Sequence, residues 1–292
     1  MGALKMDKKY LLIILISISI FTVGCSKTKG TESTTQTKTT TVAKTATPAS
    51  STNNAASTEP SKSTSSNVAS SSSVTYQISK NVYTNKNITI NYPQITNLGD
   101  ANKQKSINEI IKSEALKVLD YYKGITDVVT LNINYDIKLK SENLLSLQYS
   151  GIGYAKSAAH PNNLLYTTNI NLNKGTRLKL TDIVKVDQNL VNKFRTGTYK
   201  SQQADPDKSL QTAAKESVQQ LTTADLIKNF NNADSLDSIG TVNQSDTFSY
   251  FTKDSLGVSV PISPAAGDHS EFEIKYQDIQ NNINSQNKYL LP

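Results

Sequence analysis

Six apolar residues alternate strictly with polar ones in the middle of this chain, and this pattern constrains the fold more than any other sequence feature. They are Val129, Leu131, Ile133, Tyr135, Ile137 and Leu139. Successive side chains of a β-strand point to opposite faces of its sheet, so the pattern predicts a strand with one buried and one solvated face. Sheets solvated on one face are typically antiparallel.

The alternation continues beyond this strand. Its next apolar members are Leu145, Leu147 and Tyr149 after a turn, Tyr166, Ile170 and Leu172 after a loop, and Leu178 and Leu180 after Asn173-Lys174-Gly175. Turn residues between short alternating runs predict neighbouring strands joined by hairpins. The middle of the chain is therefore predicted to be an antiparallel meander, with Tyr135, Tyr149 and Tyr166 in its core.

Helical and further strand patterns lie on both sides of this meander. A hairpin is predicted at 82–92, ending at Pro93, and a helix at 107–122, ending at Gly124. Residues 187–232 have helical spacing, and strands return at 247–252, 256–260 and 271–276. This order predicts an α+β fold in which helices cover an antiparallel sheet meander.

The N-terminus has the features of a lipoprotein signal peptide. Lys5, Lys8 and Lys9 precede an apolar run at 10–21, and Gly24 stands before Cys25, the only cysteine of the chain. An uncleaved membrane helix fits less well, because residues 10–23 number 14 and a span needs about 20. We predict a signal peptide at residues 1–24, starting at Met1 or Met6, and lipidation of Cys25.

The segment after Cys25 is rich in hydroxyl side chains. From Ser26 to Thr75, 27 of 50 residues are Ser or Thr, and none is aromatic. Such a segment buries too little apolar surface to offset its chain entropy, so residues 25–75 are predicted to be a disordered linker. Residues 76–292 are then predicted to form one folded domain on the extracellular face of the cytoplasmic membrane, in a cell of the Gram-positive type.

The net charge of +7 is distributed unevenly. Residues 1–75 carry 8 Lys and 3 acids, whereas residues 76–292 carry 23 basic and 21 acidic groups. The basic excess thus belongs to the signal peptide and linker, and no nucleic-acid partner is expected. Residues 231–280 are acidic, with two Lys against eight acids. They form either an ordinary solvated surface or an electrostatic docking face.

The sequence contains few of the patterns that mark catalytic sites. His160 and His269 are the only histidines, neither lies in a metal-binding motif, and no G-x-S-x-G or phosphate-binding glycine pattern occurs. We therefore expect a protein that is not an enzyme and has neither a cofactor nor a metal. Two segments rich in small residues, 151–163 and 263–270, are expected to be loops at which a partner could approach the backbone.

These loops and their flanks resemble a known family. The resemblance rests on four parts of the chain: Ala159-His160-Pro161, the run from Lys174 to Ile183, Ile262–Gly267 with Phe272–Tyr276, and Tyr92-Pro93-Gln94-Ile95. Their order is similar to the RsiV-like extracellular domain and to the non-catalytic region of PdaC-like peptidoglycan deacetylases. The resemblance covers roughly residues 80–283.

The resemblance implies an α+β domain that faces the cell wall and binds a wall-acting protein such as lysozyme. The alternative is a non-catalytic module that binds peptidoglycan or another wall glycan. Two departures from the family are the absence of an anti-sigma segment before the apolar run and Ser157-Ala158 where glycines are usual. The candidate binding residues are Ala159, His160, Pro161, Gly267, Asp268, His269, Glu271 and Glu273.

Overall fold

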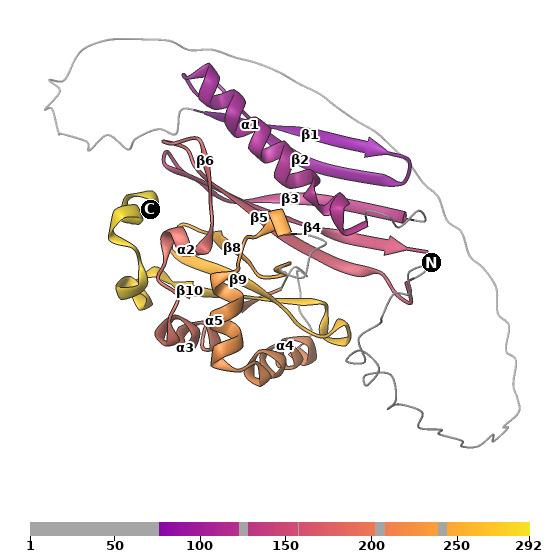
Figure 1. Ribbon diagram of the computed structural model, residues 1–292, viewed down its shortest axis with the longest axis vertical. Helices are drawn as coiled ribbons and strands as arrows, with labels where there is room; N and C mark the ends of the chain where they lie inside the picture. The colour runs from indigo at the N-terminus through magenta and orange to yellow at the C-terminus, as the bar shows by residue number, and fades with distance from the viewer. Residues whose placement is uncertain (1–75, 123–127, 157, 202–207, 239–243) are drawn as a thin grey trace, which may run out of the picture. The chain divides into compact units, whose positions relative to one another are not determined.

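The computed structural model describes residues 76–122, 128–156, 158–201, 208–238 and 244–292 (Figure 1). The predicted signal peptide, Cys25 and the predicted linker lie outside these ranges, as does Gly124. Within them, no helix is both long enough and apolar enough to cross a membrane.

The N-terminal half forms a six-stranded sheet in the strand order β1 to β6. The strands are β1 Gln77–Asn85, β2 Ile88–Thr96, β3 Val128–Lys140, β4 Leu144–Ala155, β5 Asn162–Asn171 and β6 Thr176–Leu178. From β3 to β6 the sheet is the predicted antiparallel meander. The pairing of β2 with β3 is parallel, over Ile88–Ile90, which makes the sheet mixed.

Helix α1, Ala101–Leu116, covers one face of this sheet and continues as the 3-10 helix η2, Lys117–Tyr122 (Figure 1). Asp100 caps it, its carboxylate accepting a hydrogen bond from the Lys103 N–H at 2.9 Å. Ile107 and Ile111 are fully buried against alternate residues of β3, β4 and β5. This cluster is the first of two apolar cores, and it includes Tyr149 and Tyr166, as predicted.

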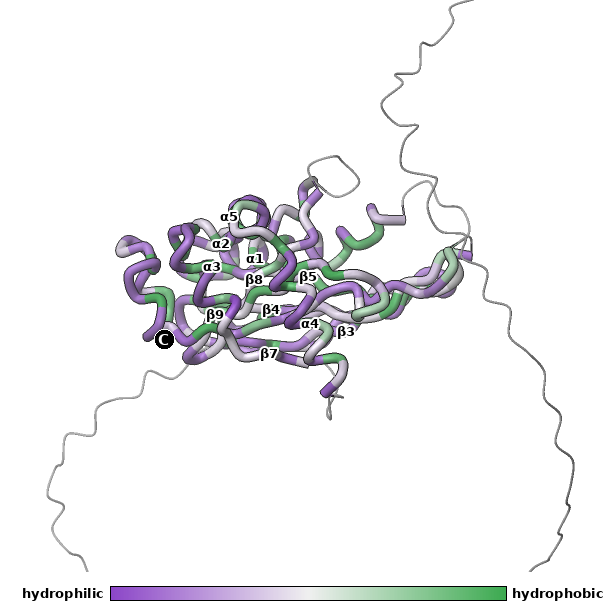
Figure 2. Tube along the Cα trace, turned by 90° about the horizontal axis from the view of Figure 1, so that it is seen from below, coloured by the Kyte–Doolittle hydropathy of each residue, from purple (hydrophilic) through white to green (hydrophobic). Residues whose placement is uncertain are grey.

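The C-terminal half forms a four-stranded antiparallel sheet in the order β7-β10-β9-β8. Its strands are β7 Thr198–Lys200, β8 Phe248–Phe251, β9 Ser255–Pro261 and β10 His269–Lys275. The helices are α2 Leu180–Ile183, α3 Gln188–Arg195, α4 Lys208–Gln220 and α5 Thr223–Asn231; short 3-10 helices are η3 Leu236–Ser238, η4 Pro264–Ala266, η5 Tyr276–Asp278, η6 Gln280–Asn282 and η7 Ser285–Leu290. The fold is thus α+β, as predicted. Apolar stretches run along β5, β8 and β9 near the middle of the domain (Figure 2).

The second apolar core lies between the four-stranded sheet and its helices. Phe194 of α3 meets Phe230 of α5 and Phe272 of β10 edge to face, with ring centroids 5.0 and 5.3 Å apart. Each of these rings is at most 1% exposed. Aromatic pairs in this arrangement add stability beyond the area that they bury.

Polar contacts join the two sheets. The Gln148 amide donates to Glu271 Oε2 at 2.7 Å, the Asn169 amide donates to the Ser249 carbonyl at 2.9 Å, and Ser146 Oγ accepts from the Phe251 N–H at 2.9 Å. These β4 and β5 side chains lie on the sheet face opposite α1, which the alternation predicted to be wet. That prediction was wrong for β4, since all residues from Leu144 to Tyr149 are buried.

Four local predictions differ from the structure. Strand β2 continues past Pro93, which it tolerates because β3 pairs with β2 only over Ile88–Ile90. Ile137 is 42% exposed, and the β3–β4 register shift that follows it places Leu139 opposite Ser146 and in the second core. Strand β7 interrupts the predicted helical region 187–232. Residues 151–155 belong to β4 and not to a loop.

Candidate functional site

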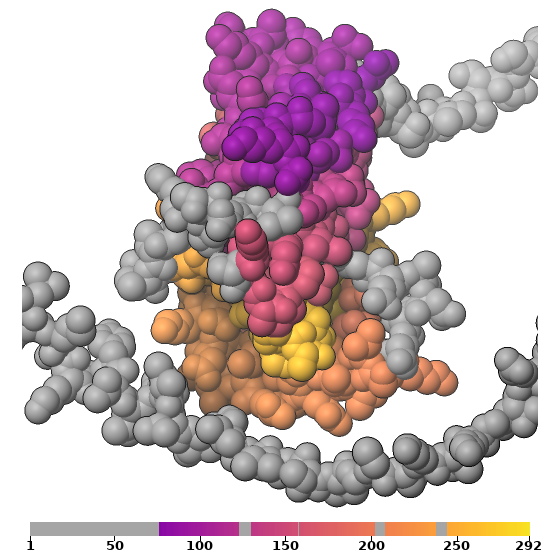
Figure 3. Space-filling view, turned by 90° about the vertical axis from the view of Figure 1, so that its right-hand side faces the viewer, coloured from indigo at the N-terminus to yellow at the C-terminus, as the bar shows by residue number. Residues whose placement is uncertain are grey.

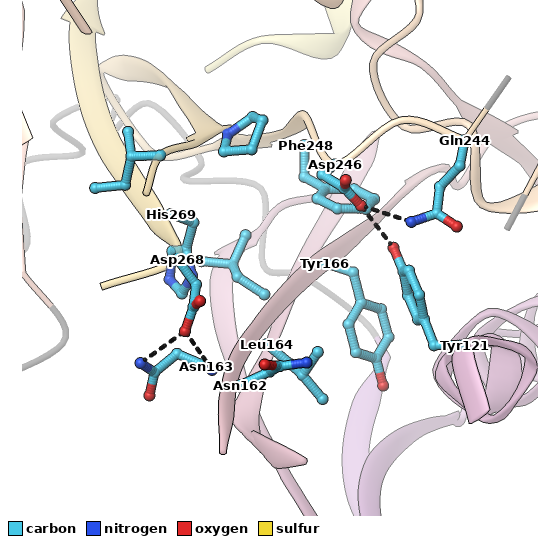
Figure 4. A pocket seen from close by; sticks show the side chains of 13 residues that line it. Tyr121, Asn162, Asn163, Leu164, Tyr166, Gln244, Asp246, Phe248, Asp268 and His269 are labelled. Carbon is cyan, nitrogen blue, oxygen red and sulfur yellow. Dashed lines mark hydrogen bonds between the residues drawn. The ribbon is translucent and has the colours of Figure 1, made fainter. Parts of the chain in front are cut away.

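The two segments rich in small residues meet in space although they are far apart in the chain. Asp268, just before β10, accepts two hydrogen bonds through Oδ2 from Asn163 at the start of β5. The donors are the Asn163 backbone N–H at 2.8 Å and its side-chain amide at 3.1 Å (Figure 4). Figure 3 shows the end of the β4–β5 hairpin (pink) beside the tip of the β9–β10 connection (yellow). We call residues 158–163 and 263–269 the loop junction.

The backbone of the β9–β10 connection holds Asp268 in place. Gly267 and Asp268 both adopt positive φ, 112° and 70°, a conformation in which Gly is unstrained and Asp is among the more tolerant residues. The Asp268 carbonyl accepts from the Ile262 N–H at 2.9 Å, and the Gly267 N–H donates to the Pro264 carbonyl at 3.1 Å. Backbone and side-chain bonds together fix the position of this carboxylate.

The opposite half of the loop junction is the end of the β4–β5 hairpin. Strand β4 extends to Ala155, and its glycines allow neighbouring parts of the chain to pack closely against it. A Cβ on Gly151 would lie 1.9 Å from the Asn132 carbonyl oxygen. Ala159, His160 and Pro161 follow and are exposed. The ring Nδ1 of His160 lies 3.0 Å from the Pro161 carbonyl oxygen, a local contact of the kind expected for a loop histidine.

Two hollows open beside the loop junction and share Asn163 and His269 among their lining residues. The first has a volume of about 360 Å³ and is shown in Figure 4. Its far wall is formed by Tyr121 and Asp246, whose carboxylate accepts from the Tyr121 hydroxyl at 3.1 Å. Burial raises the pKa of Tyr121, with a smaller contribution from Asp246, so this phenol remains protonated.

The second hollow, of about 380 Å³, lies between the two sheets, and we call it the intersheet cleft. Asn134, Ser150, Ile152 and Asn163 line it from the six-stranded sheet. Tyr199, Lys200, His269 and Glu271 line it from the four-stranded sheet, and its remaining described neighbours are Gly151, Ser201, Leu210, Ala266 and Gly267.

Two predicted binding residues, His269 and Glu271, are largely buried in the wall of the cleft. Their side chains are 14% and 4% exposed, and His269 Nε2 lies 4.0 Å from Glu271 Oε1. Burial lowers the pKa of His269, against the opposing effect of Asp268, so the ring is neutral at neutral pH. Glu271 is thus part of the interior and is not available to an exposed acidic surface.

All the other acids of 231–280 except Asp278 are buried or bonded to another side chain. Asp234 is buried, and Asp237, Asp254 and Glu273 pair with Arg177, Lys275 and Lys200, respectively. Asp246 and Asp268 bind Tyr121 and Asn163 as described above, and Asp278 is exposed. The acidic composition of this stretch therefore does not translate into a continuous acidic face.

The structure brings Gly267, Asp268 and His269 next to the β5 start that follows Ala159, His160 and Pro161. Glu273 lies farther along β10, bonded to Tyr250 at 3.2 Å and to Lys200 at 2.8 Å. Sequence reasoning missed the partners of these residues, Asn163 among them, because a single asparagine at a strand start carries no recognisable pattern.

In the part of the chain that is described, no three His, Cys, Asp or Glu side chains gather in a metal-binding arrangement. His160 Nδ1 contacts Pro161, while His269 is enclosed between the sheets. A zinc site would need both histidines together with a carboxylate such as Asp268, and the described residues do not form that group.

Comparisons with known proteins gave structural matches only. No family model and no curated protein matches the chain. A crystal structure of a DUF3298 family protein from Pseudomonas aeruginosa PAO1 has 12% identity and a TM-score of 0.41, covering 74% of this chain and 95% of its own. Another member of that family, from Bacteroides fragilis NCTC 9343, has 15% identity and a TM-score of 0.38, covering 73% and 94%.

Proposed function

We propose that this protein is a lipid-anchored surface receptor without catalytic activity, and that its loop junction docks a wall-acting protein such as lysozyme. The observation that carries the proposal is the bonding of Asn163 to Asp268 across 105 positions of sequence. It holds two chain segments in one arrangement before any partner arrives. A preordered surface loses less conformational entropy on binding, so more of the contact energy appears as affinity.

The exposed side chains of the loop junction suit a protein partner. Ala159 and Pro161 are exposed on one half, and Pro264 and Ala265 on the other. Small and rigid side chains let a partner approach the backbone closely and have little rotamer freedom to lose. Ile152, 50% exposed on β4 and paired with Asn163, adds an apolar contact beside them.

The charge distribution determines what kind of docking is expected. Because five of the eight acids of 231–280 are buried or paired with cations, long-range attraction of a basic partner contributes little. Binding should then rest on shape and on the fixed backbone of the loop junction. We expect an association rate that depends only weakly on salt concentration.

Two substitutions of Asp268 distinguish the effect of its hydrogen bonds to Asn163, which we call the brace, from the effect of its charge. Asp268→Gly keeps a backbone compatible with positive φ but removes the acceptor, whereas Asp268→Asn removes the charge and keeps an oxygen that can accept from Asn163. With lysozyme as the probe and surface plasmon resonance on the full-length chain, we expect Asp268→Gly to weaken binding about tenfold or more and Asp268→Asn less than about threefold.

Asp278→Asn, at an exposed acid of the same stretch, is the matched control and should bind as the wild type does. Equal losses for Asp268→Gly and Asp268→Asn would mean that the partner senses the charge and would refute the brace. If lysozyme does not bind the wild-type chain at low or moderate salt, the proposed partner is wrong.

A further inference from the structure

His269 lies where the brace, the first hollow and the intersheet cleft meet. It follows Asp268 directly in the chain, and it is among the lining residues of both hollows. In Figure 4 its ring lies behind Asp268, on the side of the hollow that also holds Asn163. A change in the charge of this ring therefore acts next to the residues that hold the loop junction together.

The two nitrogens of the His269 ring have different surroundings. Nε2 lies 4.0 Å from Glu271 Oε1, which is too far for a hydrogen bond. Nδ1 is buried and has no hydrogen-bond partner among the described residues. A neutral ring can leave Nδ1 without a proton, whereas a charged ring carries an N–H on both nitrogens. The second N–H would then be buried without an acceptor, which is costly.

The electrostatic surroundings of the ring come from several elements. The titratable side chains that line the two hollows with it are Asp246, Asp268, Glu271, Lys200, Tyr121, Tyr166 and Tyr199. The three carboxylates favour a charged ring, and Lys200 opposes it. Burial outweighs the rest and lowers the pKa of His269 below 6.5, against the charge of Asp268 and a contact with the Asn163 backbone.

The start of β10 can separate from β5 without unfolding of the four-stranded sheet. His269 is the first residue of β10, and it pairs with Pro261, which has no N–H to donate. Two residues farther on, Glu271 is bonded to Gln148 of the other sheet. Strand ends with few backbone bonds open at a lower free energy than the interior of a sheet. Opening can thus be confined to His269 and the brace.

We propose that the loop junction is an acid-sensitive latch, in which protonation of His269 releases the start of β10 from β5 and breaks the brace. In neutral solution the ring is uncharged and the brace holds. In acid the ring is protonated more readily when it is exposed to water than when it is enclosed, so acid favours the open arrangement. The latch needs no partner, whereas its consequence, weaker docking of lysozyme in acid, rests on the proposed function.

The sign and size of the effect follow from linkage. A histidine whose pKa is lower in the closed than in the open arrangement binds more protons when open. The stability that it lends the closed arrangement is therefore complete above the open-state pKa and is lost as pH falls through it. With 6.5 for the open ring, a change from about pH 7.5 to 5.5 raises the ratio of open to closed molecules by up to about tenfold.

Amide hydrogen exchange, followed by NMR on the full-length chain, measures this opening. The readout is the protection factor of the Asn163 N–H, which donates to Asp268 in the brace and is corrected for the intrinsic pH dependence of exchange. We expect protection to fall about three- to tenfold between about pH 7.5 and 5.5. No protection at pH 7.5, or equal protection at both pH values, would overturn the latch.

Two variants attribute the change to this one ring. His269→Gln retains a side-chain N–H but does not titrate, so the protection of Asn163 should be the same at both pH values. His160→Gln, at the exposed histidine, is the matched control and should behave as the wild type does. Asp234 titrates in the same range, but it is present in all three proteins, so the comparison removes its effect. An equal fall in His269→Gln would refute the role of this ring.

The ring itself can be followed in His160→Gln, because His269 is then the only histidine of the chain. We expect its NMR titration midpoint to lie below 6.5, and a midpoint at or above 6.5 would mean that the closed arrangement favours the charged ring. Lysozyme binding tells the two proposals apart. A latch that opens in a chain that binds no lysozyme at any pH contradicts the proposed function and supports the latch. Docking that weakens in acid equally in the wild type and in His269→Gln would contradict control of docking by the latch.

Discussion

Asp234 is a buried carboxylate whose ionisation should govern how stability changes with pH. It is 3% exposed, in the turn that follows α5, and it accepts four hydrogen bonds. The donors are the Ser249 N–H and hydroxyl, the Leu180 N–H and the Thr167 hydroxyl, at 2.7 to 3.2 Å. Burial raises the pKa of Asp234 to about 6, and these bonds offset only part of that effect.

The sign of the pH dependence follows from linkage. A carboxyl group with a folded pKa above its unfolded value binds more protons in the folded state, so its contribution to stability is complete below the unfolded pKa and is lost as pH rises through the folded pKa. The interval from 3.8 to about 6 corresponds to about 3 kcal/mol, at about 1.4 kcal/mol per pH unit. That loss should occur between about pH 4 and pH 6.5.

Asp234→Asn removes the titration while keeping the backbone. Asp234 has φ of 61°, which asparagine tolerates, so no backbone strain is added. Either orientation of the amide places its NH₂ group against the N–H of Leu180 or Ser249, which costs about 1–3 kcal/mol at every pH. The stability of the wild type relative to this variant should therefore fall by about 3 kcal/mol as pH rises and then become constant.

Urea unfolding of the full-length chain at a series of pH values, followed by circular dichroism, measures this difference. Asp278→Asn, at an exposed acid, controls for the loss of one negative charge. A difference that stays constant over the pH range would refute the raised pKa. A difference that grows with pH would show that the four donors outweigh burial and hold the pKa below its ordinary value.

Two further predictions concern the anchor and the packing between strands. Cys25→Ala should leave an unprocessed precursor or release the protein from the membrane fraction, and unchanged lipid labelling at the mature size would contradict the predicted lipidation. Gly257→Ala should lower the free energy of unfolding in urea by about 2 kcal/mol or more, because its Cβ would lie 2.1 Å from the buried Tyr250 ring. A variant of wild-type stability would show that this ring can move aside.

Much of the secondary structure could be predicted because burial on one face leaves a periodic signal. Strands β3, β5, β9 and β10 and helix α1 all follow their apolar spacing. The parallel contact of β2 with β3 could not be predicted, since it covers three residues on each strand and involves a long connection through α1. Strand pairing depends on three-dimensional contacts that an alternating pattern leaves open.

The buried polar face was missed for a physical reason. Ser146 and Gln148 are polar, and polar residues on alternate strand positions normally indicate contact with solvent. Here they are at most 3% exposed and are stabilised by hydrogen bonds to partners more than 20 residues away. Burial that rests on distant polar partners carries no local hydrophobic signal.

The candidate site, too, could be predicted from the sequence only in part. The two small-residue segments were recognised from composition, but their meeting rests on Asn163 and Asp268, whose sequence neighbours suggest nothing of the kind. The acidic stretch was recognised too, yet Asp234 and Glu271 are interior residues. Composition indicates how many charges a segment carries, whereas their exposure depends on which sheet face each strand turns inward.

The polar contact between the sheets connects these observations. A polar interior is costly unless its groups are paired, and toward the Asp234 side they are: Asp234 has four donors, and Asn169 and Ser146 bond to the backbone of edge strand β8. Toward the loop junction the same interface opens into the intersheet cleft, where Glu271 and His269 line a space large enough for a ligand. An apolar interface would stabilise two stacked sheets at least as well. The polar residues therefore do not make this interface more stable than an apolar one would be; at the mouth of the cleft, the bond between Gln148 and Glu271 sets the distance between the two sheets.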